Sequence, residues 1–155
     1  MKAVVISDSH GFSSNIYYVL SREKDISTVI FLGDGMSDIE KAHQWFPEHK
    51  FICVKGNNDF HSAEDTVAYR HFEGTTVVIT HGHYYNVRYS RRELISHAEG
   101  VMANLALYGH THKAEDYTDE ITGIRVVNPG ALCDGRYAVI DFSKGGRVEV
   151  KLTRI

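Results

Sequence analysis

The chain has 155 residues, 24% of them charged and 43% hydrophobic, which is enough for one domain with a sizeable buried core. Its net charge of −3 argues against a general nucleic-acid binder, because such proteins usually carry an excess of Lys and Arg. No apolar run is long enough to span a membrane, and no signal-peptide core precedes the first expected strand. We therefore expect a single domain over residues 1–155 of a cytoplasmic protein, and homo-oligomerisation is left open.

The first half of the sequence predicts strands that alternate with helices. Apolar runs typical of buried strands occupy residues 4–6, 29–32 and 51–54. Between them, residues 14–24 carry apolar side chains at helical spacing. Ser37 and Glu40 have the spacing of a capping box, which predicts the start of a second helix that Pro47 ends.

The second half is richer in strands. Residues 66–80 predict two strands joined at Glu73-Gly74. Ser90 and Glu93 repeat the capping-box pattern, for a helix that ends at Gly100. Further strands are expected at residues 105–108, 124–127, 137–142 and 148–152, the last two as a hairpin around Ser143-Lys144-Gly145-Gly146. An α/β beginning with an antiparallel finish predicts an α/β fold of two packed sheets, with helices on the outer faces.

Polar side chains follow five of the expected strands at the point where each one ends. They are Asp8 and His10, then Asp34, Asn57, His81, and finally His110 and His112. Because ligands collect at the carboxyl ends of strands in α/β sheets, these seven side chains should converge on one edge of the fold. They provide more donors than one ion needs, which predicts a dinuclear metal site.

The donor types suggest which ions this site would hold. Carboxylates and imidazoles suit manganese, iron or zinc, and the presence of only two cysteines argues against a structural thiolate zinc site. Asp34 lies between Gly33 and Gly35 and is the best candidate to bridge two ions, since the glycines let the backbone turn tightly. A bridging carboxylate holds two cations roughly 3.5–4 Å apart, the separation used by two-metal hydrolases.

Spacing suggests how the paired donors could reach the ions. Alternate residues of a strand point to the same side, so Asp8 and His10 can reach one ion if the strand stays extended there. The same reasoning applies to His110 and His112, although these two could serve different ions.

The ordered motifs Asp-x-His, Gly-Asp, Gly-Asn-x-Asp, His-Gly-His and Gly-His-Thr-His resemble those of the calcineurin-like metallophosphoesterase superfamily. The short length, the opening Ser-Asp-Ser-His-Gly and the later Asn128-Pro129-Gly130 resemble its small bacterial and archaeal phosphodiesterase branch. The resemblance spans residues 8–130 and implies a four-layer α/β/β/α sandwich. It also implies two divalent ions, most often manganese, with iron, zinc, nickel or magnesium as alternatives.

The resemblance further implies how the ligands divide between the ions. The first ion would be held by Asp8, His10, Asp34 and His112. The second would be held by Asp34, Asn57, His81 and His110.

One position departs from the family pattern. Many catalytic relatives carry a histidine after the Gly-Asn pair, where this chain has Asn58. An amide can hydrogen-bond a phosphate oxygen but cannot act as a general acid. Help for the leaving group must therefore come from the metals, from water or from another residue such as His83, whose alternative role is to support the ligand loop. Asp59 either orients a neighbouring ligand or caps a loop.

Two functions are consistent with these features. The first is a metal-dependent phosphoesterase, chiefly a phosphodiesterase acting on a small phosphate ester, in which a hydroxide bridged by two ions attacks phosphorus. The second is a non-catalytic protein-interaction scaffold that keeps the fold, as some members of the superfamily do. Such scaffolds typically lose metal ligands, whereas every ligand position is filled here, and this favours the enzyme.

Overall fold

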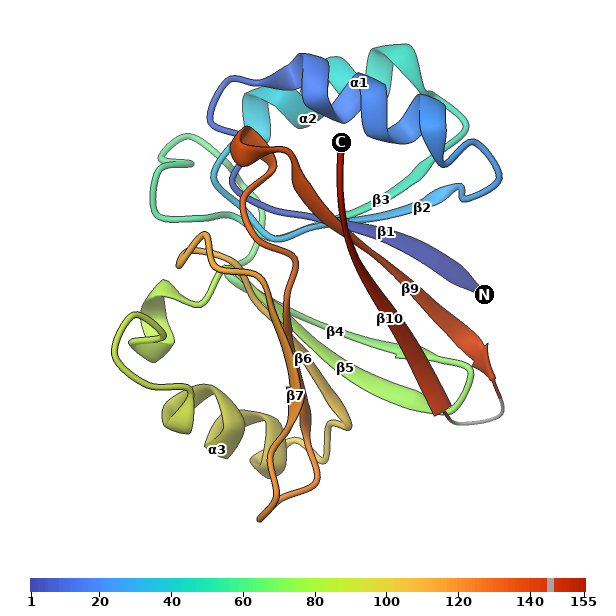
Figure 1. Cartoon of the computed structure of the whole chain (residues 1–155). Coiled ribbons are helices and arrows are strands. Elements are labelled where there is room, and N and C mark those ends of the chain that lie inside the picture. Colours follow the sequence, from blue (N-terminus) through green and yellow to red (C-terminus); the bar gives the residue numbers. More distant parts are fainter. Residues whose placement is uncertain (145–146) are drawn as a thin grey trace.

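The computed structural model describes residues 1–144 and 147–155 and has the predicted four layers (Figure 1). Two five-stranded mixed sheets pack face to face, with α1 and α2 over the outer face of one and α3 over the other. The strands are β1 (Lys2–Ile6), β2 (Thr28–Phe31), β3 (Lys50–Cys53), β4 (Val67–Phe72), β5 (Thr75–Thr80), β6 (Leu105–Leu107), β7 (Glu115–Thr118), β8 (Arg125–Asn128), β9 (Arg136–Lys144) and β10 (Arg147–Arg154). The helices are α1 (Ser13–Arg22), α2 (Met36–Trp45) and α3 (Arg92–Gly100), with short 3-10 turns at His83–Tyr85 and Leu132–Asp134.

The first sheet has the order β10-β9-β1-β2-β3. Strands β1, β2 and β3 run parallel, whereas β9 pairs antiparallel with β1 and with β10, as the predicted hairpin requires. Successive residues of β1 alternate between two buried faces. Val4 packs among the side chains of α1 and α2, while Val5 faces the second sheet. Burial on both faces explains why these strands read as continuous apolar runs.

The second sheet has the order β4-β5-β6-β8-β7. Its central strands β5, β6 and β8 are parallel, and β4 and β7 close the two edges in antiparallel pairing. Leu94 and Ala98 of α3 pack on its outer face against Val78 and Ala106. Since β1, β2 and β3 in one sheet and β5, β6 and β8 in the other form the parallel ladders, the loops that leave these strands are the ones that can carry a site.

Both predicted capping boxes are wrong. Helix α2 already includes Ser37, and its N-cap is Gly35, whose N–H donates to the carboxylate of Asp59 instead. At α3 the N-cap is Arg91, and Glu93 accepts hydrogen bonds from the Asn86 amide rather than folding back on Ser90. At α2 a partner outside the local four-residue pattern satisfies the helix start, whereas at α3 the Ser90 hydroxyl accepts the Arg92 N–H but the reciprocal contact of Glu93 is missing. The predicted end of α3 at Gly100 is confirmed.

Strand β7 has no counterpart among the predicted elements. Its sequence, Glu115-Asp116-Tyr117-Thr118, is short and largely polar, so it carries little apolar signal. It forms because Arg125 of β8 makes a two-bond ion pair with Asp116, alongside the antiparallel ladder. Of the predicted hairpin turn, Gly145 and Gly146 lie outside the described residues.

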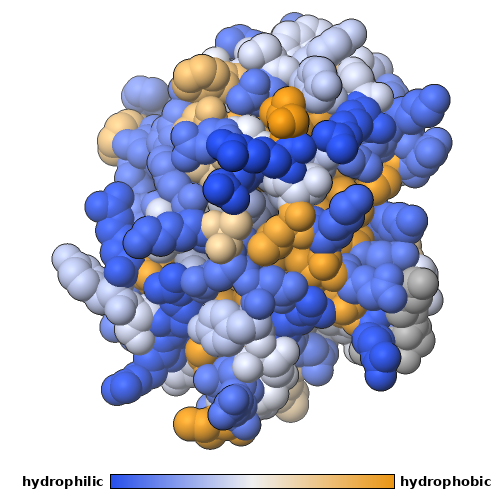
Figure 2. Space-filling model, in the orientation of Figure 1, coloured by the Kyte–Doolittle hydropathy of each residue, from blue (hydrophilic) through white to orange (hydrophobic). Residues whose placement is uncertain are grey.

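The face seen in Figure 2 is mainly hydrophilic, with apolar atoms gathered over β9 and β10 in the right-hand half of the view. Half-buried Val139, Val148 and Val150 lie on these strands. Within the part of the chain that the structure describes, no helix combines the length and the apolar character needed to cross a membrane.

Candidate metal centre

The seven predicted ligands lie in loops that follow five parallel strands. The loop after β1 carries Asp8 and His10, the loop after β2 carries Asp34, the loop after β3 carries Asn57, the turn after β5 carries His81, and the loop after β6 carries His110 and His112. The structure brings all seven side chains together through a chain of contacts shorter than about 4 Å. Donors from both sheets therefore meet at one end of the sandwich.

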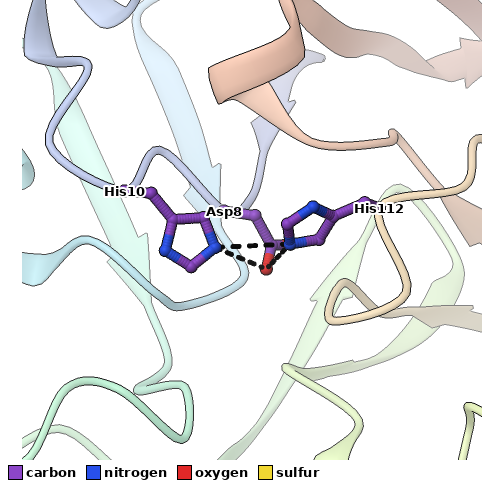
Figure 3. A group of neighbouring side chains, drawn as sticks. All are labelled: Asp8, His10 and His112. Atoms are coloured by element: carbon purple, nitrogen blue, oxygen red, sulfur yellow. Dashed lines mark hydrogen bonds and ion pairs between the residues drawn. The ribbon is translucent and has the colours of Figure 1, made fainter.

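Asp8, His10 and His112 form one cluster of this centre, and Figure 3 shows their donor atoms turned toward one another. Asp8 Oδ1 lies 3.2 Å from His112 Nε2 and 3.7 Å from His10 Nε2, and the two ring nitrogens are 3.3 Å apart. Asp8 is fully buried, and its Oδ1 has no hydrogen-bond partner among the described residues. An unsatisfied buried carboxylate oxygen facing two imidazoles fits a divalent cation.

His81 organises the second cluster. Its Nδ1–H donates to the carbonyl of Leu32 at 2.7 Å, which leaves the Nε2 lone pair directed into the site. Asn57 Oδ1 lies 3.1 Å from this Nε2, and His110 Nδ1 lies 3.2 Å from it. A fixed tautomer with its free nitrogen beside an amide oxygen and a second imidazole is the arrangement that metal-binding histidines adopt.

Asp34 lies between the two clusters. Its Oδ2 is 3.4 Å from His81 Nε2 and 4.0 Å from His10 Nε2. Burial opposes ionisation of this carboxyl, but the hydrogen bond and charge of His81 in its protonated, metal-free form, together with hydrogen bonds from Asn58, outweigh it and hold its pKa well below the usual range. Burial, followed by the positive charges of His81 and Arg88, lowers the pKa of His110 to about 4. Both groups are therefore in metal-binding protonation states at neutral pH.

Backbone strain is concentrated at these same residues. Five of the predicted ligands have a positive φ: Asp8 (55°), His10 (46°), Asp34 (63°), His110 (65°) and His112 (60°). The expectation that the paired donors meet on extended strands is therefore wrong, because left-handed residues turn the chain at both motifs. Such conformations are uncommon for side-chain-bearing residues and cluster at functional sites.

Glycines allow the loops to approach one another closely. A Cβ built on Gly56 would lie 2.1 Å from Asp34 Oδ1 and 2.6 Å from the Asp34 backbone nitrogen. A Cβ on Gly109 would lie 1.9 Å from Ser7 Oγ and 2.9 Å from Asp8 Oδ2. The glycines of the Gly-Asn and Gly-His motifs thus leave room for the two carboxylates.

Replacing Gly56 by alanine is expected to lower metal affinity by about 10–100-fold, the usual cost of disturbing groups that orient a ligand. The new methyl group must displace Asp34, because the two cannot occupy the same space. Metal titration of the variant measures the effect. Gly100→Ala is the matched control, since a Cβ at the end of α3 meets nothing within 4 Å. Equal affinities for the two variants would contradict the prediction.

The structure settles the role of Asp59, which the sequence left between two alternatives. One carboxylate oxygen accepts N–H donors from Gly35 and Met36 at the start of α2, and the other accepts those of Asp34 and Gly56. Asp59 therefore orients the loop of a predicted ligand and also caps a helix. Charge-assisted hydrogen bonds of this kind are the strong ones.

Asn58 and His83 both lie beside the predicted ligands. The Asn58 side-chain amide donates to Asp34 Oδ2 at 2.6 Å, so it is engaged with a ligand. His83 lies in a 3-10 turn after left-handed Gly82, and its ring centroid is 5.4 Å from that of His81. Its Nδ1 is buried without a partner among the described residues. Burial and the charge of His81 lower the pKa of His83.

Sequence reasoning missed several residues that support the ligands. Ser7 Oγ–H donates to Asp8 Oδ2, and buried Asp38 accepts from Ser9 Oγ and from the Gly11 N–H. Asn128, noted in the sequence only as part of the motif Asn128-Pro129-Gly130, donates from Nδ2 to the Gly109 carbonyl. The serines on both sides of Asp8 were the available signal for the first of these contacts.

A family model described as the calcineurin-like phosphoesterase superfamily domain matches residues 1–145. The chain belongs to this superfamily. A curated relative, the probable metallophosphoesterase YsnB of Bacillus subtilis, is 27% identical over 133 residues, which cover 85% of this chain and 75% of that protein. The predicted family and its α/β/β/α fold are therefore confirmed.

Solved structures of similar proteins share the fold over nearly the whole chain. A conserved protein of Streptococcus pneumoniae, described as a predicted phosphoesterase, superposes with a TM-score of 0.80 at 25% identity, covering 99% of this chain and 88% of that one. Vps29 of Entamoeba histolytica in complex with Zn²⁺ superposes with a TM-score of 0.76 at 17% identity, covering 99% of both chains. The second likeness shows the common fold alone.

Proposed function

We propose that residues 1–155 form one metallophosphoesterase domain that hydrolyses phosphodiesters with the help of two divalent cations. The observation that carries this proposal is the buried Oδ1 of Asp8, which has no hydrogen-bond partner among the described residues and lies beside His10 and His112. Asp34 connects this cluster to a second cluster of donors. Without a ligand at this place, one oxygen of the buried carboxylate would have no hydrogen-bond partner among the described residues. Membership of the phosphoesterase superfamily supports the same function.

The two donor clusters fit the two ions. We assign Asp8, His10, Asp34 and His112 to one cation and Asp34, Asn57, His81 and His110 to the other, with manganese as the first candidate. When bound, the pair of cations would supply an activated water nucleophile and stabilise the charge that builds up on the phosphoryl oxygens.

The remaining roles belong to the protein. The Asn58 amide fixes the orientation of the Asp34 carboxylate through two hydrogen bonds, one from its backbone N–H and one from Nδ2. His83 lies next to the clusters, and its buried Nδ1 has no partner among the described residues; as a neutral imidazole it is placed to donate a hydrogen bond to a phosphate oxygen. Its lowered pKa favours this role over delivery of a proton.

Hydrolysis is expected to depend steeply on the leaving group. Asn58 cannot donate a proton, and a neutral His83 is a weak acid, so an alkoxide would leave without protonation. Diesters whose leaving group is an acidic phenol should therefore be hydrolysed faster than alkyl monoesters. Rates measured across a series of aryl and alkyl esters test this. Fast turnover of alkyl monoesters, with chemistry shown to be rate-limiting and no dependence on leaving-group acidity, would contradict it.

The experiment that tests the function is an assay of the chelator-treated protein, reconstituted separately with manganese, zinc, iron, nickel and magnesium, on bis-aryl and mono-aryl phosphates. We expect activity to vanish on metal removal, to return with at least one of these ions and to be greater on the diester. The alternative is a non-catalytic interaction scaffold, for which no ion would restore hydrolysis. The complete set of seven donors favours the enzyme over the scaffold.

A further inference from the structure

A pocket of about 410 Å³ adjoins the metal centre, within the size range of small-molecule sites. It is lined by Arg88, Arg91, His110, Thr111, His112 and Lys113. His110 and His112 form the wall that it shares with the metal centre, whereas Asp8, Asp34 and His81 do not line it. A group bound in this pocket would thus lie beside two of the predicted ligands.

The pocket contains two cations without counter-charges. Arg91 is neutralised, because its Nε and Nη2 donate to the two carboxylate oxygens of Glu115 at 2.8 and 2.6 Å. Exposed Arg88 and Lys113 make no side-chain hydrogen bond or ion pair with any described residue. Two unpaired cations in one hollow are notable in a chain whose net charge is −3.

The free cations of this pocket also lie beside the metal centre. Arg88 and Lys113 line the same hollow as the predicted ligands His110 and His112. A substrate held by those ligands is therefore within reach of this hollow. Free guanidinium and ammonium groups beside a site for phosphate esters are suited to a further phosphate, which Arg can bind in a bidentate manner.

We propose that this pocket binds a second phosphoryl group of the substrate, one that is not hydrolysed. The preferred substrates would then be phosphodiesters that carry another phosphate on one arm, with Arg88 and Lys113 as the residues that determine this specificity. The proposal rests on the proposed function, because it assumes that the ester to be cleaved lies at the metal centre.

Two diesters with the same leaving group test the proposal. They are the nitrophenyl esters of a deoxynucleoside 3′-phosphate with and without a 5′-phosphate, assayed on the manganese-loaded protein. We expect kcat/KM to be about tenfold or more higher with the second phosphate, as a charge-assisted hydrogen bond allows. Arg88→Met and Lys113→Met should each lower this ratio severalfold. Lys24→Met is the control, since exposed Lys24 does not line the pocket, and it should keep the wild-type ratio.

Three outcomes would overturn the proposal. The wild-type ratio could be close to one, the ratio could survive both substitutions, or the substitutions could lower kcat/KM for both esters equally. The last result would mean that Arg88 and Lys113 interact with the phosphoryl group that is cleaved. Metal content is measured for every variant, so that a lost ion is not mistaken for a lost phosphate contact.

A binding experiment separates this proposal from the proposed function. Calorimetric titration of the metal-free protein compares a deoxynucleoside 3′,5′-bisphosphate with the 3′-monophosphate. We expect the bisphosphate to bind about tenfold more tightly and Arg88→Met to remove the difference. If no ester is hydrolysed but this difference is found, the proposed function fails and the anion pocket stands. Equal binding of the two nucleotides would rule out the proposed phosphate-binding role of the pocket, whatever the activity of the protein.

Discussion

Replacement of Asp34 by asparagine is expected to lower the occupancy of both metal sites and to lower hydrolysis by more than about a hundredfold. Disturbing a residue that only orients a ligand already costs about 10–100-fold, so losing a charge shared by two ions should cost more. Asp34 Oδ2 is the oxygen that lies near donors of both clusters, 3.4 Å from His81 Nε2 and 4.0 Å from His10 Nε2.

Metal analysis after reconstitution checks this prediction. Wild-type protein should hold close to two ions per chain, and Asp34→Asn should show reduced occupancy of both. Asp25→Asn removes an exposed carboxylate after α1 and is the matched control. Circular dichroism shows whether the variant remains folded. A variant that keeps two ions with unchanged affinity would rule out a bridging role, and saturation of the wild type with a single ion would rule out the dinuclear site itself.

His83→Ala is expected to retain both ions and to lose about a hundredfold or more in rate, the usual contribution of a side chain that assists at the reacting phosphate. The reason is geometric. The ring lies 5.4 Å from His81 and 6.2 Å from His110 between centroids, and its buried Nδ1 has no partner among the described residues. Metal content and rate should be measured on the same sample.

A second substitution separates the two chemical roles open to His83. His83→Gln keeps an N–H donor but cannot titrate, so it should recover part of the rate if the imidazole donates a hydrogen bond and none if it delivers a proton. His71→Ala, an exposed histidine on β4, controls for loss of an imidazole. Unchanged activity of His83→Ala with both ions bound would assign the residue a purely structural role.

Local patterns in the sequence were sufficient for the architecture. Apolar runs such as Val4-Val5-Ile6 and Val29-Ile30-Phe31 predicted parallel strands, because a strand buried on both faces must be apolar at every position. The order of the Asp, Asn and His motifs after those strands predicted which side chains would meet, since parallel strands end at the same edge. The two-sheet sandwich follows from the apolar runs, and the resemblance of the ordered motifs to those of a known superfamily indicated the family.

The details of the centre were decided by contacts between residues far apart in the chain. An extended path was expected at Asp8 and His10, but both residues are left-handed, and nothing local in the sequence signals that strain. Asp59 accepts the backbone N–H groups of Asp34 and Met36, which lie more than 20 positions earlier in the chain, and it replaces the predicted cap at Ser37.

Strand β7 and the anion pocket also depend on contacts between residues far apart in the chain. Glu115 pairs with Arg91, and Asp116 pairs with Arg125, so a polar segment becomes an edge strand through charges supplied by other elements. That pairing also leaves Arg88 and Lys113 as the unneutralised cations beside His110 and His112. The pattern of apolar residues determined which segments are buried and where the donors leave the sheets, because the apolar or polar character of each residue reflects whether it is buried. Which charges are paired and how each ligand is oriented depended on the tertiary structure, because both are properties of distant groups brought within a few ångströms.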